Sequence, residues 1–189
     1  MKVIKLSIPG LLLIQPDLFK DERGFFLETY NILRYQDILG EQIKFVQDNM
    51  SYSRYGTIRG LHFQKEPFAQ AKLIRCTVGK IKDVAVDIRI NSPTFGKHIY
   101  VELNGDEQYQ LFIPRGFAHG FSVLSKFAIV EYKCDAYYNK LADSGIRFDD
   151  PELNIDWNIP DESVIISDKD KNYPFLSELK RGNKNDTCI

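Results

Sequence analysis

Two short stretches of the chain hold the polar residues that are best suited to chemistry. Residues 58–64 place an arginine, a glycine and His62 between apolar residues, and residues 114–121 carry His119. The chain has only three histidines, so each placement is informative. An imidazole can take up or release a proton near neutral pH. We interpret residues 58–64 as a catalytic strand and residues 114–121 as part of the pocket that it faces.

A lysine and a tyrosine fall on apolar faces of two further predicted strands. Because side chains alternate along a strand, Lys72 shares a face with Ile74 and Cys76, and Tyr132 shares a face with Val130. Such polar groups are costly in an interior unless something uses them. They are either functional groups, or a lysine whose stem lies on apolar surface and a core tyrosine with a satisfied hydroxyl.

The histidines do not form a convincing metal site. His62 is followed by Phe63 and Gln64, so one strand does not supply a His-x-His pair. His62 and His119 without a clear carboxylate partner make a weak set of ligands. We therefore expect no metal, and the alternative to catalysis for His62 is a hydrogen-bonded core histidine.

Several other polar side chains have types that suit a phosphate or a sugar. Arg23 and Arg59 each precede a glycine, and an arginine fork binds phosphate well where backbone can come close. Gln47 and Asn49 share a strand face, where their amides could contact a sugar or a base. Surface arginines and turn hydrogen bonds remain the alternative interpretations.

The elements that would position these residues are mainly strands. From about residue 44 to 138, short apolar runs recur between Gly, Pro, Asn and Asp, which predicts an all-β sandwich or jelly roll with a few short helices. Asn104-Gly105 predicts a hairpin between the flanking runs. Asn31 predicts the start of a short helix that ends at Gly40, and residues 174–179 predict a last helical turn.

Composition limits the class of protein. The chain has 189 residues, 43% of them hydrophobic, with a formal net charge of −1, so one folded domain over residues 1–179 with a polar tail at 180–189 is expected. A nucleic-acid binder would show a basic excess. Three cysteines without a CxxC pair fit reduced thiols, and no apolar run is long enough for a signal or membrane segment, so we expect a cytoplasmic protein without nucleic-acid or membrane partners.

The motifs, taken together, resemble the dTDP-4-dehydrorhamnose 3,5-epimerase family, cupin-fold epimerases of nucleotide-linked 4-keto sugars. The resemblance covers nearly all of residues 1–179. The stretches that carry it are Arg23 to Glu28, Gln47 to Asn49, Ile58 to Gln64, Gln70 to Leu73, Asp83 to Arg89, Ile113 to Phe121, Tyr132 to Cys134, Tyr137-Tyr138, Asp150-Pro151 and Ser167 to Asp170.

The resemblance implies a catalytic role for four residues. The residue matching His62 is the base that removes the proton next to the 4-keto group, and the one matching Asp170 holds that imidazole. The residue matching Lys72 stabilises the enolate oxygen. The residue matching Tyr132 delivers a proton from the opposite face and so inverts the carbon.

It also implies a set of binding residues, a dimer and the absence of any metal or organic cofactor. Arg59, Arg23 and Lys169 match diphosphate ligands. Gln47, Asn49 and His119 match contacts to sugar or phosphate. Glu28 and Phe26 match contacts at the base end, and Tyr138 matches the ring that stacks on thymine. Family members are homodimers that exchange N-terminal strands, so Arg23 to Glu28 are expected to serve the neighbouring subunit.

One departure and three alternatives accompany this interpretation. Many members have a glutamate where this chain has Asp143, which is one methylene shorter and affects a contact at the nucleotide end. The expected reaction is epimerisation of dTDP-4-dehydro-6-deoxy-D-glucose at C3 and C5. The alternatives are an epimerase acting on one carbon only, a 3,4-ketoisomerase, against which Tyr132 argues, and a non-catalytic binding module.

Overall fold

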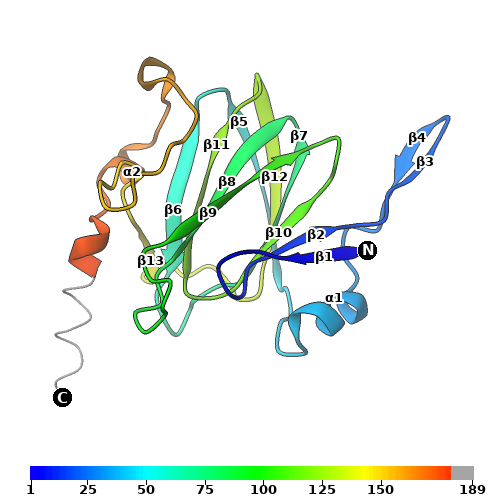
Figure 1. Cartoon of the computed structure of the whole chain (residues 1–189), viewed down its shortest axis with the longest axis horizontal. Helices are drawn as coiled ribbons and strands as arrows, with labels where there is room; N and C mark the ends of the chain where they lie inside the picture. Colours follow the sequence, from blue (N-terminus) through cyan, green and yellow to red (C-terminus); the bar gives the residue numbers. More distant parts are fainter. Residues whose placement is uncertain (180–189) are drawn as a thin grey trace.

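Two antiparallel β-sheets face each other in the structure, a computed structural model that describes residues 1–179 (Figure 1). One sheet has the order β1-β2-β10-β7-β12-β5, with bounds Lys2–Lys5, Leu12–Gln15, Gln110–Ile113, Lys72–Val78, Phe127–Cys134 and Gln47–Arg54. The other has the order β13-β6-β11-β8-β9, with bounds Asp143–Gly145, Ile58–Gln64, Phe117–Val123, Lys80–Asp87 and His98–Asn104. The all-β prediction is confirmed, and the predicted tail at 180–189 lies outside the described residues.

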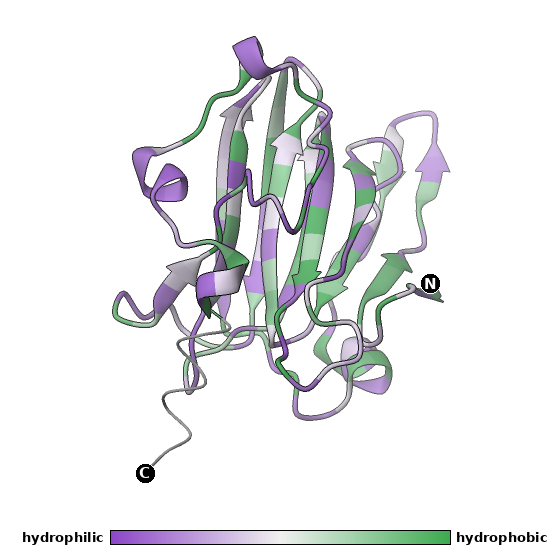
Figure 2. Ribbon diagram, turned by 60° about the vertical axis from the view of Figure 1, so that its left-hand side comes forward, coloured by the Kyte–Doolittle hydropathy of each residue, from purple (hydrophilic) through white to green (hydrophobic). Residues whose placement is uncertain are grey.

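The space between the sheets holds the main hydrophobic core. Ile74, Cys76 and Val130 of the six-stranded sheet pack there with Ile81 and Phe121 of the five-stranded sheet. Figure 2 shows hydrophobic residues mainly along the strands and hydrophilic residues mainly in the loops. Burial of this apolar area is the dominant favourable term in folding.

Each sheet is also covered on its outer face. Val84, Ala118 and Trp157 belong to a second cluster, where the segment after β13 covers the five-stranded sheet. Tyr35 belongs to a third cluster, where α1 (Ile32–Leu39) covers part of the six-stranded sheet together with Leu73. Strands β8 and β11 are therefore covered on both faces, and every residue of the two strands except Lys80 is buried.

The helices of the described residues are short and lie between or after the strands. The predicted helix is confirmed as α1: Asn31 accepts hydrogen bonds from the amides of Leu33 and Arg34, and Gly40, with φ of +96°, follows the last turn. Two short elements follow near the C-terminal end, η1 (Asp161–Ser163) and α2 (Asp168–Lys171), and residues 176–179 form the predicted last helical turn. Among residues 1–179, no helix is both long and apolar enough to cross a membrane.

The hairpin predicted at Asn104-Gly105 is wrong. The Asn104 side chain does accept hydrogen bonds from the amides of Asp106 and Glu107, so a turn forms there. However, β9 pairs with β8, whereas β10 pairs with β2 and β7 in the other sheet. The turn therefore carries the chain from one sheet to the other, because β10 completes the six-stranded sheet instead of returning along β9.

A separate hairpin extends away from both sheets. It consists of β3 (Phe19–Asp21) and β4 (Gly24–Phe26), and it projects on the side of the molecule opposite α2 (Figure 1). Its phenylalanines are exposed, Phe19 at 63% and Phe26 at 69%. At the same time β5 is the edge strand of the six-stranded sheet, with Met50 and Tyr52 exposed. An exposed apolar hairpin and a free sheet edge are features that favour association with another chain.

A buried carboxylate fixes the loop after β8. Asp87 is fully buried and its carboxylate accepts hydrogen bonds from the side chains of Arg89, Ser92 and Thr94, at distances of 2.6 to 2.9 Å. Burial opposes ionisation, but the bonds from Arg89 and the two hydroxyls outweigh it and hold the pKa of Asp87 well below its usual 3.8. The ionised carboxylate therefore stabilises the fold at neutral pH.

We expect Asp87→Asn to lower the free energy of unfolding by about 3 kcal/mol at pH 7, because it leaves the Arg89 guanidinium without its buried partner. The stabilisation requires an ionised Asp87, so it is complete above the unfolded-state pKa and is lost as pH falls below about 4. Urea unfolding of both proteins from pH 7 to pH 3 should show the difference narrowing. Asp106→Asn, at an exposed turn, serves as the control, and a constant difference across this range would contradict the assignment.

Candidate functional site

The predicted catalytic histidine is held by a carboxylate that lies far away in sequence. The Nε2 atom of His62 on β6 lies 2.8 Å from Oδ1 of Asp170, on α2. The His62 side chain is 34% exposed and that of Asp170 only 5%. With Asp170 ionised, Nε2 carries the ring proton and its N–H donates a hydrogen bond to the carboxylate, which leaves the lone pair of Nδ1 available as a base.

Local structure places Asp170 and keeps it ionised. Ser167 is the N-cap of α2 and its hydroxyl accepts a hydrogen bond from the amide of Asp170, while the Asp170 carboxylate accepts from the amide of Gly60 at 3.1 Å. Burial favours the neutral acid, but the interactions with His62, Gly60 and Ser167 outweigh it and lower the pKa of Asp170. The carboxylate therefore stays charged and fixes the imidazole orientation.

Gly60 allows β6 to approach β11 unusually closely. Its φ is +124°, and a Cβ atom there would lie 2.6 Å from Cα of Gly120 and 2.8 Å from the carbonyl oxygen of His119. A Cβ on Gly120 would in turn lie 2.7 Å from the carbonyl oxygen of Arg59. Only two facing glycines fit this approach, which brings His62 and His119 into register as paired residues of the two strands.

The second predicted histidine also has a carboxylate partner. Nε2 of His119 lies 2.9 and 3.0 Å from the two carboxylate oxygens of Asp83, which is fully buried on β8. Asp83 is not among the residues predicted for the site. Its position was readable, however, because alternation along β8 puts it on the interior face together with Ile81 and Ala85.

Lys72 and Tyr132 lie on the facing six-stranded sheet, on β7 and β12. Burial lowers the pKa of Lys72, although nearby Cys134, Asp83 and Asp143 favour its charge. Burial raises the pKa of Tyr132, so the phenol keeps its proton at neutral pH and is a competent proton donor. The interior position that alternation gives to Tyr132 agrees with its packing against the main core.

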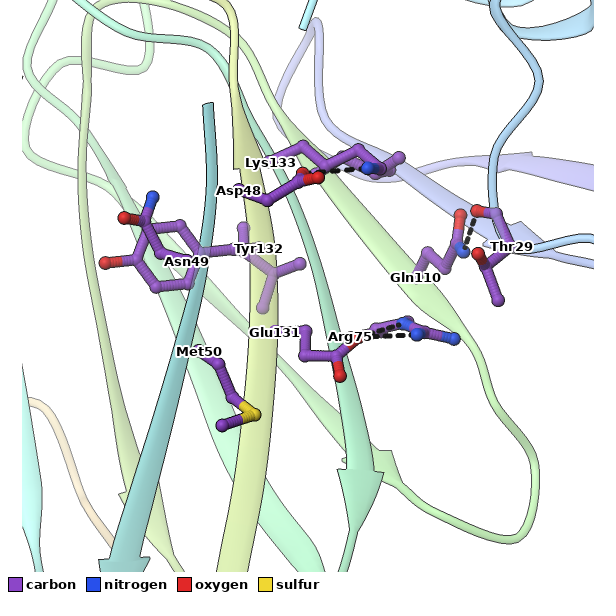
Figure 3. Close-up of a pocket in the computed structure, with 11 residues that line it drawn as sticks. Thr29, Asp48, Asn49, Met50, Arg75, Gln110, Glu131, Tyr132 and Lys133 are labelled. Atoms are coloured by element: carbon purple, nitrogen blue, oxygen red, sulfur yellow. Dashed lines mark hydrogen bonds and ion pairs between the residues drawn. The ribbon is translucent and has the colours of Figure 1, made fainter. Parts of the chain in front are cut away.

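The close-up confirms which side of the sheet Tyr132 faces. Figure 3 shows Tyr132 and Asn49 pointing to one side of the six-stranded sheet, whereas Arg75 and Gln110 extend to the other side. Asn49 is the paired residue of Tyr132 across β5 and β12. The outer side carries a separate cavity of about 340 Å³, rich in ion pairs such as that of Arg75 with Glu131.

A larger cavity of about 750 Å³ opens beside His62. Its lining includes Arg59, Ser53 and Lys169 in addition to the His62–Asp170 pair. Nε of Arg59 donates to the Ser53 hydroxyl at 2.9 Å. The cationic side chains of Arg59 and Lys169, both in the lining of this cavity, are suited to hold an anionic ligand.

Several predicted binding residues bond to one another beside Lys169, which lines this cavity. Lys169 pairs with the carboxylate of Asp143, which also accepts a hydrogen bond from the Tyr138 hydroxyl at 3.1 Å. The amide of Tyr138 donates to Gln47, whose side chain donates to Asn49 at 2.9 Å. Five predicted residues from four places in the sequence are therefore brought together in one hydrogen-bonded chain.

Three predicted binding residues lie elsewhere in the chain. Arg23 sits on the β3–β4 hairpin, where its side chain is 86% exposed and pairs with Asp21. Phe26 is exposed on the same hairpin, and Glu28 pairs with Arg34 at the start of α1. Within one chain, none of them belongs to the His62 cavity.

Comparison with known proteins gives a consistent result. A sequence model described as dTDP-4-dehydrorhamnose 3,5-epimerase matches residues 5–178. The dTDP-4-dehydrorhamnose 3,5-epimerase of Shigella flexneri is 50% identical over 172 residues, which cover 91% of this chain and 94% of that protein.

Two solved structures show the same likeness. The dTDP-4-dehydrorhamnose 3,5-epimerase of Elizabethkingia anophelis has 48% identity and a TM-score of 0.89, covering 94% of this chain and 97% of the other. A dTDP-6-deoxy-D-glucose-3,5-epimerase of Legionella pneumophila, in complex with dTDP-4-keto-L-rhamnose, has 43% identity and a TM-score of 0.91, covering 96% and 95%. These likenesses confirm the predicted cupin jelly roll.

Gly60→Ala tests the close approach of β6 to β11. We expect it to lower the free energy of unfolding by about 3 kcal/mol or more, because strain at a positive φ adds to a clash with backbone atoms. Gly24→Ala is the matched control, since Gly24 has a φ of +129° but no atom within 4 Å of the added Cβ. It should cost about 1 kcal/mol from strain alone. Equal losses in urea unfolding would show that the contact with Gly120 is not limiting.

Proposed function

The chain belongs to the dTDP-4-dehydrorhamnose 3,5-epimerase family, and we propose how its residues carry out the reaction of that family. The enzyme is an isomerase that converts dTDP-4-dehydro-6-deoxy-D-glucose into dTDP-4-dehydro-L-rhamnose, by removing and returning protons at C3 and C5. The proposal rests chiefly on one observation: His62, bonded to Asp170, and Tyr132 belong to opposite sheets that face each other.

His62 is the base of the proposed reaction. Its Nδ1 lone pair takes the proton from the carbon next to the 4-keto group, and the resulting imidazolium is stabilised by the Asp170 carboxylate at 2.8 Å. The electron pair of the broken C–H bond moves into the carbonyl, which becomes an enolate. The second inversion repeats these steps at the other carbon flanking the same carbonyl.

Lys72 stabilises the negative charge that forms on the enolate oxygen. A donor placed where charge develops contributes about 10²–10³ in rate when water is excluded. Burial of Lys72 supports this role, because its charge is poorly screened there. The carboxylates of Asp83 and Asp143 help the ammonium to keep its proton.

Tyr132 is the acid that completes each inversion. Its phenol delivers a proton to the face of the carbon opposite His62 as the carbonyl re-forms. The phenolate then takes a proton from solvent and the His62 imidazolium releases its proton to solvent, so both groups are restored for the second inversion. The raised pKa of Tyr132 supports this role, because the group must arrive protonated. His119, held by Asp83, lies beside His62 in the register and contacts the sugar or a phosphate in this proposal.

The remaining residues at the mouth bind the nucleotide diphosphate. Arg59 and Lys169 hold the diphosphate, Tyr138 stacks on the thymine, and Gln47 and Asn49 contact the sugar. The bonds of Asp143 to both Lys169 and Tyr138 support this assignment, because they bring a cation suited to phosphate and an aromatic ring suited to a base close together. Asp143 exchanges its partners when the diphosphate arrives.

The active enzyme is a homodimer in this proposal, with residues 1–179 as one catalytic domain. The β3–β4 hairpin of each protomer lies along the β5 edge of its partner, so that Arg23, Phe26 and Glu28 reach the partner's nucleotide site. The exposed hairpin, the free β5 edge and the distance of Arg23 from its own cavity support this arrangement. We place the enzyme in the cytoplasm, where the unpaired thiols of Cys76 and Cys134 remain reduced.

Proton exchange separates the roles of His62 and Tyr132. With dTDP-4-dehydro-6-deoxy-D-glucose in heavy water, the wild type should incorporate deuterium at C3 and C5. We expect His62→Ala to abolish exchange with the fold intact, and Tyr132→Phe to spare proton abstraction more than inversion. NMR of the recovered sugar nucleotide reports both. Normal inversion by the phenylalanine variant would assign the acid to another group.

Mixing two inactive variants tests the exchanged hairpin. Arg23→Ala and His62→Ala homodimers, unfolded together and refolded, form heterodimers in which one of the two sites has both residues if Arg23 acts on the partner. Activity should then recover to about a quarter of wild type, from random pairing in a symmetric dimer. A mixture of His62→Ala with Tyr132→Phe is the control: both residues belong to the same chain's site, so every site in the mixture keeps one substitution and no recovery beyond the unmixed variants is expected. If Arg23 served its own chain, the first mixture would recover no more than the unmixed Arg23→Ala protein does, since its intact sites would not form.

A further inference from the structure

One aromatic ring touches the catalytic imidazole and has no part in the reaction described above. The rings of Tyr173 and His62 meet in a T-shaped arrangement, with centroids 5.8 Å apart and planes inclined by 67°. Tyr173 follows α2 by two residues and precedes Pro174, whose carbonyl accepts a hydrogen bond from the amide of Arg147 at 3.1 Å. The segment that carries the ring is thereby tied to the chain just after β13.

A glycine makes room for this ring. Gly145 on β13 is the paired residue of His62 on β6. A Cβ atom on Gly145 would lie 2.5 Å from Cε2 and 2.6 Å from Cδ2 of Tyr173. The tyrosine ring therefore lies directly over the backbone next to His62, in a space that a side chain at position 145 would fill.

The bond to Asp170 does not by itself fix the imidazole. The outer torsion of a histidine side chain is broad, so covalent preference leaves the ring free to turn. A single hydrogen bond at Nε2 anchors one atom and permits rotation about that bond. Rotation would move Nδ1, the proposed basic atom, relative to a substrate carbon. A ring packed against the imidazole removes this freedom, as T-shaped aromatic pairs do elsewhere.

The ring of Tyr173 has a defined packing contact, whereas its hydroxyl has no defined hydrogen-bond partner among the described residues. The hydroxyl is buried and makes no hydrogen bond of normal geometry within residues 1–179. The ammonium of Lys169, 5.7 Å from the ring centroid, is near enough to act on it electrostatically. The contacts of this residue that have clear geometry are those of the ring, which places its role in shape and not in hydrogen bonding.

We propose that the ring of Tyr173 is a positioning element for His62, which holds the Asp170-bound imidazole so that its free nitrogen faces the substrate carbon. The inference rests on the proposed role of His62 as base. Tyr173 contacts the imidazole of His62, so its effect is expected on proton abstraction and not on the binding of the nucleotide. Misplacement of a reacting group by about 1 Å can cost about 10²-fold in rate.

The test compares Tyr173→Phe, which keeps the ring, with Tyr173→Leu, which keeps apolar bulk without it. Deuterium uptake at C5 measures abstraction, the dissociation constant of dTDP measures binding, and thermal unfolding measures the fold. We expect the leucine variant to lose about tenfold or more in exchange while its dTDP affinity stays within about twofold of wild type. The phenylalanine variant should exchange at close to the wild-type rate. Tyr100→Leu, on the exposed side of β9, is the control for loss of a tyrosine.

Three outcomes would overturn the inference. Exchange at the wild-type rate by both the leucine and the phenylalanine variant would show that the ring does nothing for His62. Parallel loss of exchange and dTDP affinity in the leucine variant would show a merely structural role. Equal loss in both variants would transfer the role to the hydroxyl. His62→Ala measured alongside keeps the two proposals apart, because persistent exchange there removes the base assignment whatever the Tyr173 variants do.

Discussion

The hydrogen bond between His62 and Asp170 is the interaction on which the arrangement of this site depends. It joins the five-stranded sheet to the C-terminal segment that covers its outer face, across 108 positions of sequence. Two further contacts hold Asp170 in place. The amide of Gly60 donates to its carboxylate, and the hydroxyl of Ser167, the N-cap of α2, accepts from its backbone amide. The same segment supplies Lys169 to the mouth of the cavity and Tyr173 to the imidazole. Docking of the segment from Ser167 to Tyr173 and assembly of the site are consequently one event.

The sequence predicted what depends on local chemistry and on alternation. Asn31 and Gly40 bound α1 as expected, because capping is decided within a few residues. The interior position of Tyr132 followed from its parity with Val130. The turn at Asn104-Gly105 formed, but its strands do not pair, because turn chemistry is the same whether a chain folds back or crosses to another sheet. Pairing partners depend on distant strands that a local pattern does not contain.

The site was predicted in part from residues and in larger part from resemblance. Alternation indicated Lys72 and Tyr132, whereas the role of Asp170 came from the family alone, since nothing in its surroundings points to His62. The same alternation argument places Asp83 on the interior face with Ile81 and Ala85, although Asp83 was not among the residues predicted for the site. Tyr173 carries no local signal, and its contact with His62 arises from the return of the chain past Gly145. Residues whose role depends on contacts between distant parts of the chain can be identified only from the three-dimensional structure.

The facing glycines of β6 and β11 have a practical consequence for engineering. Neither Gly60 nor Gly120 tolerates a side chain, because each would strike backbone of the opposite strand, and backbone cannot be trimmed by a compensating mutation. In a randomised library aimed at new sugar nucleotides, variants substituted at either of these two positions are expected to be destabilised. Randomised positions are better placed around Arg59 and Lys169, which line the cavity, and Asp143, which pairs with Lys169. Flexible side chains contact one another there, so neighbouring groups can adjust to a substitution.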